Sequence, residues 1–172
     1  MDVKSGRQAD KGGPKRLQPE RHAAFLVVAL ANKISASASR AYMRHYGIGV
    51  MEWRALAMLA ARPGITANQI AQVSAIDKSS VSRAVQALIR RGYVAASGDE
   101  SDNRRTLLAL TPDGLALHDR MIPVSFAREE LLLTGLTQAE QKVLLELLAR
   151  LNGNMTLVNA HDPNAEPALR TR

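Results

Sequence analysis

The sequence predicts a mainly α-helical protein with one small β-hairpin. Hydrophobic residues make up 46% of the 172 residues, whereas aromatic residues make up only 3%, which favours helices packed through small and branched side chains. Apolar residues recur at helical spacing through most of the chain. Only residues 93–97 and 106–110 have the composition of strands. A chain of this length forms one domain, or one domain with added helices.

Charge and residue usage narrow the classes of function. The net charge of +7 would attract a polyanion before any specific contact formed. The chain has no cysteine, and its four histidines, at positions 22, 45, 118 and 161, are widely spaced, so we expect no metal, no cofactor and no enzymatic activity. The apolar residues 23–31 are too few to span a bilayer, which predicts a cytoplasmic protein.

The two ends of the chain are predicted to serve assembly. Residues 1–18 are basic and rich in glycine, which predicts a disordered arm. A dimerisation helix is expected within residues 19–48, and two more within 112–153, the first kinked at Pro123 and the second capped by Thr137 with Glu140. Residues 154–172 are expected to form a flexible tail. Two apolar stripes lack a partner in the centre of the chain and should pack across a two-fold axis: Leu26, Leu30 and Ile34, and Leu144, Leu148 and Leu151.

The central residues 49–111 have the signals of a winged helix-turn-helix. A helix over 51–62 stops at Pro63-Gly64, and Thr66 with Gln69 forms a capping box for the next helix. Residues 74–76 form the turn, although they lack the glycine common there. Asp77 caps the following helix, which Gly92 ends. The loop 98–105 then separates the two strands of the wing, and Thr111-Pro112 begins the next helix.

The helix after Asp77 has one apolar and one polar side. Arginine and lysine donate to guanine, glutamine pairs with adenine, and serine serves bases or phosphates. An ordinary solvated face usually carries glutamate as well, but this face has no carboxylate beyond its cap, so we interpret it as a DNA-contact face. Its members are Lys78, Ser79, Ser82, Arg83, Gln86 and Arg90.

The wing tip adds Asp102, Asn103, Arg104 and Arg105. An arginine on a hairpin fits the narrow minor groove of DNA, where negative potential is concentrated. A carboxylate two residues away, that of Asp102, can orient the guanidinium through a hydrogen-bonded pair. A solvated charged turn would have the same composition, so the tip alone does not decide between these interpretations.

These motifs resemble the MarR family of transcriptional regulators. Residues 102–105 followed by Leu-Thr-Pro-Asp-Gly at 110–114 are similar to the family's wing signature, D-x-R followed by L-T-x-x-G, and residues 66–71, 77–83 and 88–92 add to the likeness, which covers about 22–153. The resemblance implies a homodimer with interlocked terminal helices that reads a pseudo-palindromic double-stranded DNA operator. The DNA contacts that it implies fall on Lys78, Ser79, Ser80, Ser82, Arg83, Gln86 and, in the wing, Arg104. Arg105 beside it is a further candidate for DNA contact.

The resemblance also implies a small effector, an aromatic acid or its coenzyme A thioester, bound between the dimer helices and the winged domain. Cations and aromatic rings suit a ring that bears a carboxylate. For Trp53 a core role is favoured over a ligand contact, and His45 could be either a ligand contact or a solvated side chain. We therefore expect a repressor linked to aromatic compound catabolism; the alternative is an architectural DNA-binding protein without a regulatory role. The effector candidates are Arg40, Tyr42, His45, Tyr46, Trp53, Arg54 and His118.

Overall fold

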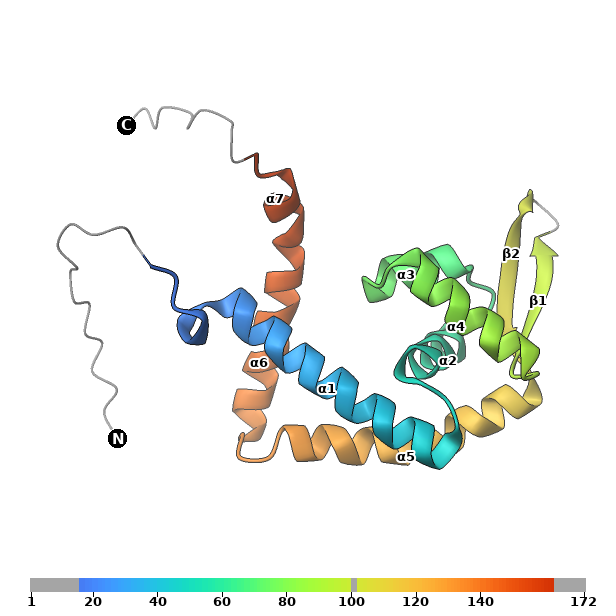
Figure 1. The fold of residues 1–172 in the computed structure, drawn as a ribbon, viewed down its shortest axis with the longest axis horizontal. Coiled ribbons are helices and arrows are strands. Elements are labelled where there is room, and N and C mark those ends of the chain that lie inside the picture. Colours follow the sequence, from blue (N-terminus) through green and yellow to red (C-terminus); the bar gives the residue numbers. More distant parts are fainter. Residues whose placement is uncertain (1–15, 100–101, 163–172) are drawn as a thin grey trace. The chain divides into compact units, whose positions relative to one another are not determined.

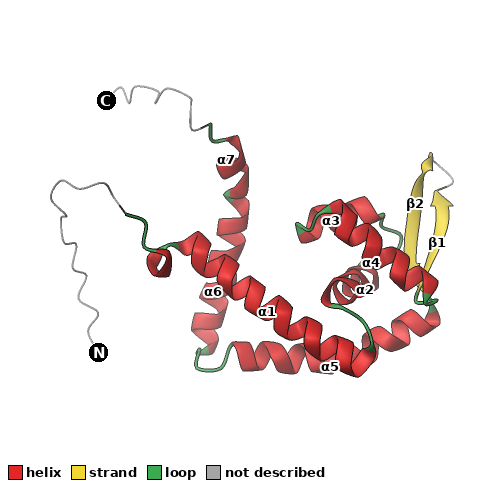
Figure 2. Cartoon of the chain, in the orientation of Figure 1, coloured by secondary structure: helices red, strands yellow, loops and turns green. Residues whose placement is uncertain are grey.

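The computed structural model describes residues 16–99 and 102–162, and it divides into two compact units. The first unit, Met1–Met121, contains a 3-10 turn (Pro19–Arg21), α1 (Ala23–Tyr46), α2 (Val50–Ala61), α3 (Ala67–Ser74), α4 (Lys78–Arg90), β1 (Val94–Asp99), β2 (Asp102–Leu110) and the start of α5 (Pro112–Leu132). The second unit, Ile122–Arg172, contains the rest of α5, α6 (Gln138–Gly153) and α7 (Met155–Ala160). Figures 1 and 2 show the elements. The predicted mainly helical fold with a two-stranded wing is confirmed.

The core of the first unit lies among α2, α3 and α4. Leu56 and Leu59 of α2, Ile70 of α3 and Leu88 of α4 are at most 1% exposed. Ile48, in the link between α1 and α2, is fully buried beside them in the same unit. Each such side chain contributes about 1.5–3 kcal/mol by leaving water. This apolar centre holds the helix-turn-helix in place from within its own chain.

The helix starts that the sequence predicts are confirmed in detail. The backbone N–H of Gln69 donates to Thr66 Oγ1 at 3.2 Å, and that of Thr66 donates to Gln69 Oε1 at 2.8 Å. The backbone N–H of Ser80 donates to Asp77 Oδ1 at 2.8 Å. The turn between α3 and α4 has no glycine, and Ala75 adopts the left-handed conformation there with φ of 52°, a geometry that a side chain disfavours.

The wing is an antiparallel ribbon in which Val94 pairs with Leu110 and Gly98 with Thr106. The prediction of a loop over 98–105 is wrong in its length, because β2 begins at Asp102 and β1 continues to Asp99. Polar residues can extend the strands because antiparallel strands pair through their backbone groups. The ribbon is also joined to the segment before α3, where the Leu108 N–H donates to the Ile65 carbonyl at 3.1 Å.

The base of the wing is fixed to the first turn of α5. Thr111 Oγ1 donates to the Gly92 carbonyl at 2.6 Å and accepts from the Gly114 N–H at 3.1 Å. A Cβ atom at Gly114 would collide with the carbonyl oxygen of Tyr93, so only glycine permits this approach. The capping role predicted for Thr111 is confirmed.

The second unit consists of exposed helices. Thr137 and Glu140 form the predicted capping box, with the Thr137 N–H donating to Glu140 Oε2 at 2.8 Å. The prediction that residues after Gly153 form a flexible tail is wrong for Met155–Ala160, which form α7. Asn154 keeps nearly helical dihedrals and its N–H bonds to the Arg150 carbonyl. The helical path therefore continues past Gly153 into α7.

Two other predictions concern the kink at Pro123 and the basic N-terminal arm. Pro123 lies inside α5, which continues through it, and the kink stays a prediction. The basic arm falls outside the described residues except for its last three, Arg16, Leu17 and Gln18. Across residues 16–99 and 102–162, no helix is both long enough and apolar enough to cross a membrane.

Candidate nucleic-acid interface

Helix α4 separates its residues into a buried side and an exposed side, as predicted. Val81, Ala84, Val85 and Leu88 are at most 6% exposed and face the core. The polar residues of the opposite side are accessible, with Ser80 half-buried at its edge. Because the buried side fixes the rotation of the helix, it also fixes which residues face a ligand. The exposed members are Lys78, Ser79, Ser82, Arg83, Gln86 and Arg90.

A groove of about 640 Å³ lies between this polar side, the start of α3 and the wing. Figure 1 shows these elements beside one another in the first unit. Lys78 and Arg105 contribute positive charge, and no carboxylate is among the described residues that line the groove. Its polar lining is Thr66, Asn68, Gln69, Lys78, Ser82, Gln86, Arg105 and Thr106, around an apolar floor that includes Val85 and Leu108.

The contribution of α3 to this groove was missed by sequence reasoning. Thr66 and Gln69 were interpreted only as a capping pair, and Asn68 was not considered. The signal was available, since a capping box places the helix start, and the first turn of a helix is usually exposed. Its direction toward the wing follows from the bridge between Ile65 and Leu108, which has no local sequence signature.

Hydrogen bonds at the start of α4 pre-arrange several of its polar groups. The Ser79 hydroxyl donates to Asp77 Oδ1 at 2.6 Å, and Arg83 Nη2 donates to Ser80 Oγ at 3.2 Å. The pKa of Asp77 is held far below its ordinary value, first by the bond from the Ser79 side chain and then by those from Ser80. The carboxylate therefore stays ionised as a cap, while Arg83 keeps other N–H groups for a ligand.

The predicted wing residues are described to different extents. Arg105 is exposed and lines the groove. Asp102 and Arg104 belong to β2 by their backbone, but their side chains fall outside the described residues. The support that Asp102 would give to Arg104 therefore stays a prediction.

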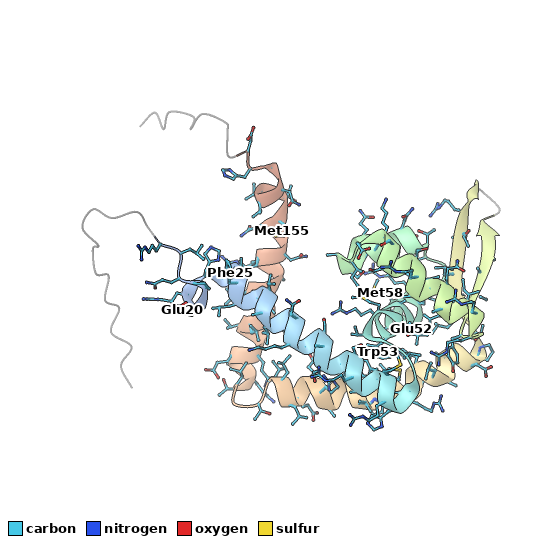
Figure 3. All side chains as sticks on the ribbon, in the orientation of Figure 1. Glu20, Phe25, Glu52, Trp53, Met58 and Met155 are labelled. Atoms are coloured by element: carbon cyan, nitrogen blue, oxygen red, sulfur yellow. The ribbon has the colours of Figure 1, made fainter. Side chains whose placement is uncertain are left out.

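Among the effector candidates, three aromatic rings come together from α1, α2 and α5. The ring centres of Tyr42 and Trp53 are 5.7 Å apart, and those of Trp53 and His118 are 5.6 Å apart with a stacked angle of 20°. Tyr42 and Trp53 are only 3% and 8% exposed; Figure 3 labels Trp53 on α2. His118 Nδ1 lies 2.9 Å from Asp119 Oδ1. Trp53 is thus a core residue, one of its two predicted interpretations.

The other effector candidates take part in separate contacts or are exposed. Arg54 Nη2 donates to Ser35 Oγ at 3.0 Å, and the Tyr46 hydroxyl donates to the Arg120 carbonyl at 3.2 Å. The His45 ring lies 6.5 Å from that of Tyr46. Arg40 and His45 are exposed on α1. The seven candidates therefore do not converge on a single point in the first unit.

Comparisons with known proteins agree with this geometry. The family model described as "MarR family" matches residues 46–105. A MarR/EmrR family transcriptional regulator from Acinetobacter sp. ADP1 has a TM-score of 0.77 at 30% identity, over 82% of this chain and 99% of that one. The PcaV transcriptional regulator from Streptomyces coelicolor, solved in complex with its natural ligand, has a TM-score of 0.67 at 26% identity, over 81% and 98%.

Among curated proteins, the HTH-type transcriptional repressor NicR from Pseudomonas putida is 31% identical over 83 residues, which cover 48% of this chain and 52% of NicR. The chain spans about half the length of the curated relatives it matches.

The fold and the groove define a winged helix-turn-helix protein. The relatives that match it are named as transcriptional regulators, not as enzymes, in agreement with the predicted lack of enzymatic activity. The chain belongs to the MarR family.

Proposed function

We propose that this chain is a sequence-specific DNA-binding repressor that a small aromatic acid, or its coenzyme A thioester, releases from DNA. The observation that carries the proposal is the groove in which the polar side of α4 meets the start of α3 and the wing. Its donors are anchored on packed elements, and it presents the positive charges of Lys78 and Arg105. Such a surface suits the phosphates and base edges of duplex DNA.

The contacts divide by chemistry. Arg83, Ser82 and Gln86 on the exposed side of α4 would read base edges in the major groove. Lys78, Ser79 and Ser80 at the start of the helix would serve the backbone, with Lys78 contacting phosphate. Arg104 and Arg105 would enter the minor groove from the wing, supported by Asp102. Base-edge contacts confer sequence preference, and phosphate contacts confer affinity and salt dependence.

A homodimer would cover the apolar surface that both units expose. Leu26 and Leu30 of α1 are 52% and 50% exposed, and Leu148 and Leu151 of α6 are 43% and 48% exposed. Large apolar side chains exposed at helical spacing on each helix suit an interface with another copy of the chain. Two-fold pairing would present two α4 helices to half-sites about 34–36 Å apart on a pseudo-palindrome.

The effector proposal rests on the ring cluster and on the relatives. PcaV is solved with its natural ligand, and NicR is named a repressor. Arg40 and His45 are exposed on α1, within three residues of Tyr42 in the sequence, and could meet a carboxylate, while Tyr46, Trp53, Arg54 and His118 would line the rest of the site. A ligand releases DNA to the extent that it binds the non-reading conformation more tightly.

Selection of bound duplexes from a random-sequence pool tests the proposal. We expect enrichment of one pseudo-palindromic sequence, hereafter the operator. Arg83→Ala should weaken binding to it, whereas Lys142→Ala, which removes the same charge from exposed α6, should not. Uniform coating without enrichment would instead indicate an architectural protein. An operator complex that no aromatic acid or thioester dissociates would exclude the effector class.

A further inference from the structure

Arg91 follows the last residue of α4, and its side chain reaches three other parts of the first unit. Its Nη1 donates to the Gly47 carbonyl oxygen at 2.7 Å and lies 3.9 Å from Glu52 Oε1. Its guanidinium carbon lies 5.2 Å from the centre of the Tyr93 ring. Gly47 ends α1, Glu52 lies in the first turn of α2, and Tyr93 precedes β1. One side chain thus joins α4 to two scaffold helices and the wing.

The bond to Gly47 is a charge-assisted hydrogen bond at the carboxyl end of a helix. Gly47 has a left-handed φ of 68° and its N–H bonds to the Met43 carbonyl, so its own carbonyl points beyond α1 and needs another partner. A guanidinium there meets the partial negative charge of the helix terminus. The contact spans 44 residues of sequence, so it fixes tertiary geometry.

Glu52 gives the second anchor and has two functions. Its Oε2 accepts the Gly49 N–H at 2.5 Å and so begins α2, while Oε1 faces Arg91. Its side chain is 15% exposed, compared with 35% for Arg91. Figure 3 labels Glu52 on α2. The carboxylate is therefore held by the backbone before it meets the guanidinium, which lowers the entropy cost of the ion pair.

The residues of these contacts are not among those that line the DNA groove. Arg91 is not among the residues that line it, and it lies at the opposite end of α4 from Lys78. We propose that Arg91 is a positioning residue: through Gly47 and Glu52 it sets the orientation of α4 and the start of the wing, and operator affinity depends on it without contact with DNA. The inference rests on the proposed DNA-binding function.

The test measures operator affinity over a series of salt concentrations for the wild type and Arg91→Ala. We expect the variant to bind about tenfold more weakly at each concentration, a loss within the range of interaction energies between residues in contact. The slope of log Kd against log salt should stay unchanged, because a lost phosphate contact would lower it by about 0.9. A lowered slope would show that Arg91 contacts DNA and would overturn the proposal.

Glu52→Gln provides a variant with the opposite electrostatic expectation. The amide oxygen can still accept the Gly49 N–H, but the protein loses one negative charge, which by itself strengthens its attraction to DNA. Loss of the anchor predicts weaker binding instead, and the double variant should bind no more weakly than Arg91→Ala alone. Unchanged or tighter binding by Glu52→Gln would overturn the proposal.

Arg91→Lys separates positioning from a general loss of stability. Lysine keeps the charge and a donor but not the planar fork, so it should recover part of the operator affinity. Melting temperatures measured on the same samples show whether affinity changes while the proteins stay folded; variants that lose affinity only in proportion to unfolding would overturn the proposal. A wild type that selects no operator would overturn the proposed function itself, and this inference with it.

Discussion

Helices α4 and α6 begin with the same kind of N-cap, but their apolar residues lie in different environments. Both have an N-cap side chain that accepts a backbone N–H, and both carry apolar residues on one side. Helix α4 buries Val81, Val85 and Leu88 within its own unit, whereas no residue of α6 is buried. The orientation of α4 is therefore determined by its own chain. For α6 we propose that the orientation depends on a partner surface, since most of its leucines are exposed.

The largest expected effect comes from breaking the buried side of α4. Leu88 is fully buried, so Leu88→Ala should lower the free energy of unfolding by about 2–5 kcal/mol through lost burial and a cavity. Leu145→Ala on α6, where the side chain is 59% exposed, is the matched control and should cost far less. Denaturant unfolding at fixed protein concentration measures both, and equal losses would contradict the comparison.

Charge placed on the exposed leucines of α6 tests their need for a partner. The double variant Leu148→Asp and Leu151→Asp should dissociate the proposed dimer, because carboxylates are costly to bury without partners. Sedimentation at micromolar concentration should show a dimer for the wild type and a monomer for the variant. A wild type that is already monomeric would show that these leucines have no such role.

Substitutions on the polar side of α4 test which of its exposed residues discriminate between DNA sequences. Arg83→Ala and Ser82→Ala should reduce discrimination between operator and scrambled duplexes by about 1–3 kcal/mol each. Lys78→Ala should weaken binding to both duplexes more evenly, because a phosphate contact carries no sequence information. Competition binding measures the ratio. Equal losses on both duplexes for all three variants would contradict the assignment of reading residues.

The smallest effect concerns the cap of α4. The pKa of Asp77 is lowered in the folded protein, so its stabilising contribution is present above the unfolded pKa of about 3.9 and is lost as pH falls through the folded value. Asp77→Ala should lower the melting temperature slightly at pH 7, with a smaller difference from wild type in strong acid. Asp77→Asn keeps an acceptor and should lose less. A difference independent of pH would contradict the role of the carboxylate charge.

Local signals in the sequence predicted most of the fold. The caps at Thr66, Asp77 and Thr137 depend on residues three positions apart. The buried side of α4 follows from the helical spacing of its apolar residues. The true length of the wing depends on pairing across the hairpin, and α7 depends on the conformation of Asn154. Neither has a short-range signature.

The candidate site was predicted in part for the same reason. The polar residues of α4 share one helix, so their common side could be calculated from sequence. The share of Asn68 in the groove and the contacts of Arg91 depend on segments brought together only by folding. Long-range contacts of this kind are set by the packed core, and one sequence does not reveal them.

The absence of a side chain at Gly114 has a mechanical consequence. The first turn of α5 packs closely against the Tyr93 carbonyl, and Thr111 is hydrogen-bonded to Gly92. The start of α5 and the wing should therefore rotate together as one rigid body. The nine residues of β2 span about 30 Å at about 3.3 Å each, so a tilt of about 5° displaces the far end by about 2.6 Å. A small movement of α5 would thereby become a displacement comparable to the length of a hydrogen bond.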